Sequence, residues 1–103
     1  MKKTIITVIG YDQPGIISSV TDILLKEKCN VENISQTILQ SQFAGIFIVL
    51  IPEDHSPEKL ETIFREKLSE TDINIQVRLL EPDRIIAKPQ KTVKIIAFSF
   101  FNI

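Results

Sequence analysis

The residues best suited to contact a ligand lie in a turn at residues 10–15 (GYDQPG), directly before an expected helix. A helix N-terminus leaves its first backbone N–H groups unpaired and carries a partial positive charge. Because Gly15 has no side chain, a carboxylate can approach the amides of Gly15 and Ile16. Asp12 is an acceptor for an ammonium group. These groups suit a zwitterion, but the same residue types also occur in turns and caps for purely local reasons.

Two asparagines offer a second set of polar groups. Asn30 and Asn33 follow the same expected helix, where they either close the helix and open a strand or contact a ligand. Further along the strand, Gln36 points to the same side as Ile34 and Ile38. We interpret Gln36 as a hydrogen-bond partner of a neighbouring loop rather than a ligand contact, because most side-chain hydrogen bonds go to backbone or water.

A nucleophile–base pair is only weakly indicated. Cys29 and His55 are the one thiol and the one imidazole in the chain, and catalysis would need them within about 3 Å of each other. Cys29 follows the first helix and His55 precedes the second, so we expect them at opposite ends of the fold. Their plain interpretations are a small buried hydrophobe and an exposed loop residue. Nothing else completes a triad, so an enzyme is a remote hypothesis.

Composition excludes several other classes of function. A single cysteine allows neither an internal disulfide nor a multi-cysteine metal cluster and fits a reducing compartment. No Gly-rich phosphate loop or metal-ligand spacing occurs, so no cofactor is expected. Twelve basic against thirteen acidic residues argue against direct nucleic-acid binding. No apolar run approaches the roughly 18 residues of a membrane span. We therefore expect a cytoplasmic protein with neither nucleic-acid nor membrane partners.

Hydrophobic periodicity predicts the order strand, helix, strand, strand, helix, strand. The expected strands are residues 3–9, 31–40, 43–51 and 73–80, and the expected helices are about 14–28 and 57–69. Helical crossovers and one short hairpin predict a ferredoxin-like α+β sandwich. Its four-stranded antiparallel sheet has the order 4-1-3-2, with both helices on one face.

Turn and cap residues set the expected boundaries. Asp12 or Gln13 is expected to cap the first helix, with Pro14 in its first turn. For the second helix, residues 56–58 (SPE) combine a hydroxyl cap, a proline and an acid. Residues 41–42 are the expected hairpin connection.

Two segments at this spacing, residues 8–16 (VIGYDQPGI) and 29–37 (CNVENISQT), resemble the ACT domain family over residues 3–81. These are small regulatory amino-acid-binding modules with a ferredoxin-like fold. The chain looks closest to the modules of glycine-cleavage repressor-like proteins, which often carry two copies in tandem. The resemblance implies an amino-acid site made of Asp12, Pro14, Gly15 and Ile16 from one chain with Asn30, Val31 and Asn33 from a neighbour.

Two positions depart from the family pattern. A basic residue often precedes the proline, where this chain has Gln13. A glycine usually ends the first helix, where this chain has Lys28. If Lys28 is left-handed, it costs roughly 1 kcal/mol relative to glycine; alternatively, the helix ends on Asn30.

Residues 1–81 are thus expected to form the ACT-like domain, 82–91 a linker, and 92–103 a strand that either pairs in a dimer or begins a second module. The strand at 43–51 is apolar on both faces, yet two helices cover only one, so we expect a homodimer or a higher homo-oligomer. The main hypothesis is a non-catalytic module that senses a small amino acid. The alternative is a dimerisation or protein-interaction module without a ligand. A regulated enzyme or transcription factor is an open choice of partner.

Overall fold

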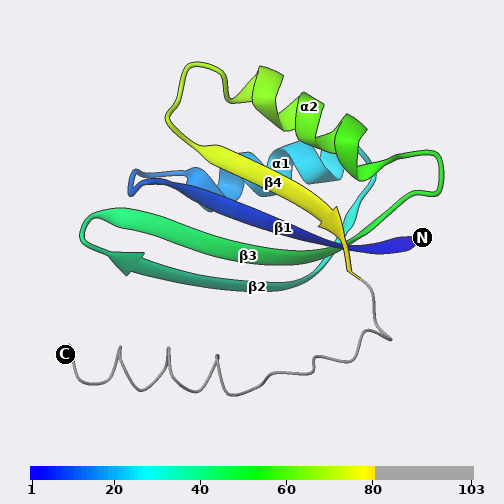
Figure 1. Ribbon diagram of the computed structural model, residues 1–103, viewed down its shortest axis with the longest axis horizontal. Coiled ribbons are helices and arrows are strands. Elements are labelled where there is room, and N and C mark those ends of the chain that lie inside the picture. Colours follow the sequence, from blue (N-terminus) through cyan, green and yellow to red (C-terminus); the bar gives the residue numbers. More distant parts are fainter. Residues whose placement is uncertain (81–103) are drawn as a thin grey trace.

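The computed structural model describes residues 1–80, which form a four-stranded antiparallel sheet with both helices on one face (Figure 1). The strands are β1 (Lys2–Tyr11), β2 (Asn30–Leu39), β3 (Gln42–Ile51) and β4 (Asn74–Leu79), and the helices are α1 (Ile16–Lys26) and α2 (Pro57–Lys67). The strand order β2-β3-β1-β4 confirms the predicted ferredoxin-like sandwich. The predicted linker 82–91 and strand 92–103 lie outside the described residues.

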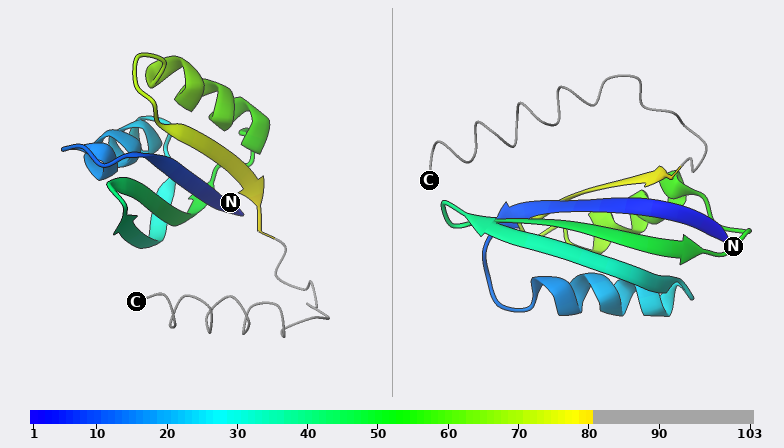
Figure 2. Two further views of the ribbon diagram at one scale, coloured as in Figure 1. Left: turned by 60° about the vertical axis from the view of Figure 1, so that its left-hand side comes forward. Right: turned by 90° about the horizontal axis from the view of Figure 1, so that it is seen from below.

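The core lies between the helices and the two central strands. Alternate residues of β1 and β3 face the helices and are buried, among them Ile6, Val8 and Phe47. Phe64 of α2 and Leu24 of α1 are completely buried against them. Figure 2 shows both helices on the same side of the sheet. Alternate residues of the strands pack against the apolar faces of the helices. This packing fixes the positions of the ends of α1 and β2.

The β2–β3 hairpin differs by one residue from its prediction. The turn consists of Gln40 and Ser41, with φ of 53° and 63°, and the strands close on the pair Leu39–Gln42. Two consecutive positive φ values fit the twist of a tight hairpin. Neither turn residue is a glycine, so the sequence predicts only the approximate position of this turn.

The first helix ends on a left-handed Lys28, with φ 62°. The Lys28 amide donates to the Leu25 carbonyl, and the Cys29 amide donates to the Leu24 carbonyl at 2.9 Å. This is a Schellman motif, which normally has glycine at the left-handed position. Of the two predicted endings, the strained one is therefore confirmed, and the ending on Asn30 is wrong.

The two edge strands of the sheet, β4 and β2, differ in whether other described residues cover them. At the β4 edge, the Val77 amide donates to Oε1 of Glu61 from α2 at 2.8 Å. Such a contact satisfies an edge donor that would otherwise attract another strand. The β2 edge has no comparable cover from the described residues, and its side chains are exposed apart from the half-buried Val31. The β2 edge is thus the one available for pairing.

Candidate ligand-binding site

A cavity of about 480 Å³ opens between the first turn of α1 and the middle of β2. It lies on the helix-covered side of the sheet, where β2 extends beyond α1. Its lining combines apolar and polar side chains, as that of ligand sites usually does. It is lined by Asp12, Gln13, Gly15, Ile16, Ile17, Ser18, Thr21, Gln36, Ile38 and Phe43.

No side chain of residues 1–80 caps the N-terminus of α1. Its N-cap residue is Gly15, which is left-handed with φ 84° and has no side chain to accept a hydrogen bond, and the first turn holds no acidic residue. The Ser18 hydroxyl donates to the Gly15 carbonyl at 3.1 Å, and no side chain of residues 1–80 accepts a capping hydrogen bond at this helix start. Within residues 1–80, no hydrogen bond uses the amides of Gly15, Ile16 or Ile17. An acceptor entering the cavity can therefore satisfy them.

The helix begins two residues later than predicted, and the expected capping by Asp12 or Gln13 is wrong. Gln13 is engaged elsewhere: its Nε2 donates to the Tyr11 carbonyl at 3.1 Å and to Asp72 Oδ1 at 3.2 Å. The Asp12 amide donates to the Ser41 carbonyl at 2.9 Å, and Asp12 is exposed and lines the cavity. Pro14 precedes the helix in an exposed turn.

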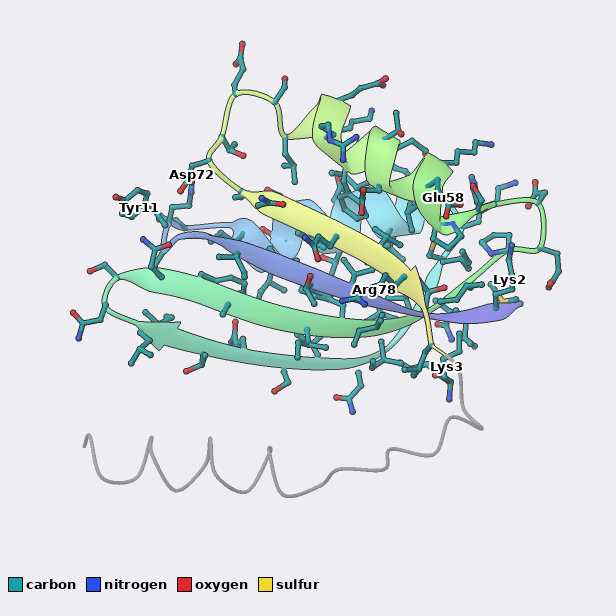
Figure 3. All side chains as sticks on the ribbon, viewed as in Figure 1. Lys2, Lys3, Tyr11, Glu58, Asp72 and Arg78 are labelled. Carbon is teal, nitrogen blue, oxygen red and sulfur yellow. The ribbon has the colours of Figure 1, made fainter. Side chains whose placement is uncertain are left out.

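Asp72 is a positioning residue that sequence reasoning missed. Its carboxylate accepts hydrogen bonds from the Tyr11 amide, at 2.8 Å, and from the Gln13 side chain, and Figure 3 shows Asp72 beside Tyr11 at the end of β1. Gly10 makes this approach possible, because a Cβ there would lie 3.1 Å from the Ile73 Cα. The contact joins residues 61 positions apart, so no local pattern could reveal it.

Asn30, Val31 and Asn33 lie at the opposite end of the sheet from the cavity. Asn30 pairs with Leu50, near the start of β1, whereas the motif turn follows the end of β1. The register shifts between Val31 and Asn33, so this end of β2 carries a bulge. Both asparagines are exposed. A single chain therefore does not bring the two predicted half-sites together.

Gln36 lines the cavity together with Ile38. Among the side-chain hydrogen bonds of residues 1–80, none involves Gln36, so the loop contact preferred from the sequence is not observed. The signal was present in the strand alternation, which places Gln36 on the helix-covered side. The alternation does not predict that β2 extends past α1, so it could not show that Gln36 faces a cavity.

The expectation that Cys29 and His55 lie at opposite ends is wrong. His55 Nε2 lies 3.3 Å from Glu27 Oε1, and the Cys29 thiol lies 3.8 Å from the Glu27 carbonyl oxygen. The loops after α1 and after β3 share one end of the sandwich. Burial, with a smaller contribution from the Glu27 charge, raises the pKa of Cys29 to about 11. This environment opposes the thiolate that a nucleophile needs.

Other kinds of site are not found in the part of the chain that the structure describes. No group of His, Cys, Asp or Glu side chains within residues 1–80 is arranged to hold a metal ion. Neither helix of this region is long and apolar enough to cross a membrane.

Comparison with known proteins supports the resemblance found in the motifs. A family model described as the ACT domain matches residues 2–78. A UPF0237 protein of Methanopyrus kandleri is 34% identical over 79 residues, which cover 76% of this chain and 88% of that protein. A UPF0237 protein of Clostridium acetobutylicum is 40% identical over 77 residues, covering 74% and 86%.

Solved structures agree. An ACT domain protein from Streptococcus pneumoniae superposes with a TM-score of 0.68 at 28% identity, covering 76% of this chain and 89% of that one. The regulatory subunit of aspartate kinase from Thermus thermophilus gives 0.59 at 26% identity, covering 76% and 51%. A proposed glycine cleavage system transcriptional repressor gives 0.68 at 17% identity, covering 84% and 49%, which shows the shared fold. The chain belongs to the ACT domain family.

Proposed function

From this family membership, we propose that the chain is a non-catalytic regulatory module that binds a small free amino acid in the cavity between α1 and β2. The observation that carries the proposal is the uncapped N-terminus of α1, whose free amides border a cavity of about 480 Å³. A helix end without an internal acceptor is a general site for an anionic group. The ligand carboxylate binds these amides, and its ammonium group binds the Asp12 carboxylate.

The second half of the site comes from a partner subunit. The exposed β2 edge can pair with the β2 edge of another copy, and two-fold symmetry makes that pairing antiparallel. In such a pair, the end of β2 that carries Asn30, Val31 and Asn33 lies over the opposite end of the partner, beside its cavity. The asparagine side chains then supply donors and acceptors to the ligand from across the seam. Residues 12–16 and 30–33, which are apart in one chain, thereby form one site.

Regulation follows from the position of the ligand at this seam. A ligand that contacts both subunits binds one arrangement of the dimer more tightly than another and shifts the populations accordingly. The presence of the fold in a regulatory subunit of aspartate kinase supports this role. The regulated target of this chain and its cytoplasmic location remain predictions.

Calorimetry and thermal unfolding against a panel of free amino acids test the binding function. We expect one amino acid or a small related group to bind and to raise the unfolding temperature. Asp12→Asn should weaken that affinity by at least about tenfold, because it removes a charge-assisted contact. The matched control is Asp22→Asn, which removes an exposed acid paired with Lys26 on the outside of α1. An absence of binding across the whole panel would leave only the alternative.

A mixing experiment tests the shared site. Asp12→Asn and Asn33→Ala each damage one half of every site in their own dimers. If the halves come from different subunits, co-refolding the two variants restores about a quarter of the sites, because half of the dimers are mixed and each has one intact site. If both halves came from one chain, mixing would restore none.

The alternative is a dimerisation or protein-interaction module without a ligand, and the open β2 edge favours it independently of the cavity. Light scattering that finds a dimer, together with no response to any amino acid, would select this function. A monomer at all concentrations would contradict both.

A further inference from the structure

The sheet face opposite the helices is apolar along both central strands. Ile5 and Ile9 of β1 and Ile46, Ile48 and Leu50 of β3 project from it, and Ile9 and Ile46 are 54% and 44% exposed. Figure 2 shows no described element over this face. Soluble proteins seldom leave such a continuous apolar surface in water.

A hollow of about 310 Å³ interrupts this face. Ala44 and Gly45 provide little bulk at its base, and Ile9 and Ile46 stand at its sides. Thr7 of β1 and residues 35–37 of β2 (Ser-Gln-Thr) complete its lining. The hollow has the apolar walls and the room that a large aromatic side chain needs.

We propose that residues 92–103 of this same chain cover the open face, with a phenylalanine side chain seated in the hollow. Eight of these twelve residues (TVKIIAFSFFNI) are apolar, and they include three of the six phenylalanines in the chain. The family model ends at residue 78, so the segment is not part of the matched ACT domain. Left in water, the segment and the face would both expose apolar surface, and their contact buries both.

The segment can reach the face. The Leu80 amide donates to the Lys3 carbonyl at 3.0 Å, so the described chain ends beside the start of β1. The hollow lies between Thr7 and Ile9, about 17 Å further along the sheet at 3.4 Å per residue. The ten intervening residues, 82–91, span up to roughly 33 Å when extended. They therefore allow residues 92–101 to run along the face and over the hollow.

The tether favours this occupant over a second copy. A short linker holds the segment at an effective concentration in the millimolar range. A second copy must instead lose translational and rotational freedom to reach the same face. The β2 edge remains free for dimer formation, so the proposal does not depend on the amino-acid site.

Thiol labelling of the full chain tests the cover. Ile46→Cys places a probe on the face, and Ile9→Cys is a second probe on the neighbouring strand. Leu25→Cys, at a side chain that is 67% exposed on α1, is the reference. The native Cys29 contributes little background, because it is only 5% exposed and has a raised pKa. The unmodified chain measures that background.

We expect both face probes to react at least about tenfold more slowly than the reference, independently of protein concentration. Replacing Phe98, Phe100 and Phe101 together by serine should bring their rates close to the reference. Rapid labelling of both probes in the full chain would overturn the proposal. Slow labelling that persists with the serines and strengthens with protein concentration would overturn it in favour of a second copy.

Discussion

The two helices of this domain begin in opposite ways. At α2, the Ser56 hydroxyl accepts a hydrogen bond from the Lys59 amide at 3.1 Å, Pro57 occupies the first turn, and Glu58 adds a negative charge. At α1, a left-handed Gly15 stands at the cap position with no side-chain acceptor and no acid in the first turn. Both helix starts have backbone amides without a partner in the helix. At α2 a side chain accepts a hydrogen bond from one of them, whereas at α1 no side chain of residues 1–80 does so.

The difference separates stability from binding. α1 does not need a cap to persist, because Ile16, Val20, Ile23 and Leu24 bury its inner face. Tertiary packing, more than local propensity, stabilises short helices in proteins. An acceptor supplied by the chain at α1 would occupy the amides that we assign to the ligand. The two termini therefore predict opposite patterns of mutational effects.

The largest effect is expected from Gly15→Val. A β-branched residue at φ 84° is strained, so the variant should lose about 2 kcal/mol of unfolding free energy. A Cβ there would meet only the Ser18 Oγ, at 3.5 Å, so the loss comes from backbone conformation. Ligand binding should also disappear, as measured by chemical unfolding and calorimetry.

Gly15→Asn separates these two losses. Asparagine tolerates the left-handed region, so stability should stay near that of the parent chain, while the added side chain occupies the cavity and weakens binding. If Gly15→Asn bound the amino acid normally, the proposed approach of the carboxylate to this turn would be wrong.

Ser56→Ala is the corresponding test at α2. Loss of the cap should reduce the unfolding free energy by about 1 kcal/mol. Ligand affinity should not change, because Ser56 lies at the other helix. A change in affinity comparable to that of Asp12→Asn would show that the two termini are not independent.

The contrast also explains what the sequence could predict. The predicted start of α2 is confirmed, because it depends on three adjacent residues, 56–58, with known capping preferences. The predicted cap of α1 is wrong for two reasons. The N-cap residue is Gly15 in a left-handed conformation, and the Gln13 side chain donates to the Asp72 carboxylate instead. That partner is 59 positions away. The strand order was predictable, since periodicity and connection lengths left few topologies.

The candidate site was only half predictable. Asp12, Gly15 and Ile16 border the cavity as their motif indicated, and Pro14 stands in the turn that leads to them. A strand pattern predicts the face on which Gln36 lies but not what lies above that face, so it could not reveal that Gln36 lines the cavity. Likewise, the predicted separation of Cys29 and His55 is wrong because the loops after α1 and β3 meet only in the folded domain, where both residues lie beside Glu27.

At the other end of α1, Lys28→Gly should stabilise the domain by roughly 1 kcal/mol, because glycine adopts φ 62° without strain. Lys26→Gly is the matched control. Lys26 is the last residue of α1 and pairs with Asp22 at 3.2 Å, so glycine there should destabilise the domain by up to about 1 kcal/mol. Thermal unfolding distinguishes the two signs. A loss of stability in both variants would mean that Lys28 makes a compensating contact.

Ser18→Asp is expected to change stability least, and it separates an effect on stability from an effect on ligand affinity. Ser18→Asp places an acid in the first turn of α1, at a side chain that lines the cavity. The carboxylate should gain about 0.5 kcal/mol from the helix dipole, offset in part by loss of the Ser18 hydrogen bond to Gly15. The same carboxylate repels and displaces the ligand carboxylate, so affinity should fall while stability holds or rises.

Ser19→Asp is its neighbour and control. Ser19 is exposed near the same helix end but does not line the cavity. Its acid should gain a similar dipole contribution, but it does not enter the cavity and cannot displace the ligand, so affinity should fall much less than in Ser18→Asp. Equal loss of affinity in both variants would indicate a general charge effect at this surface. A loss confined to Ser18→Asp would place the ligand carboxylate on the amides that residues 1–80 leave uncapped.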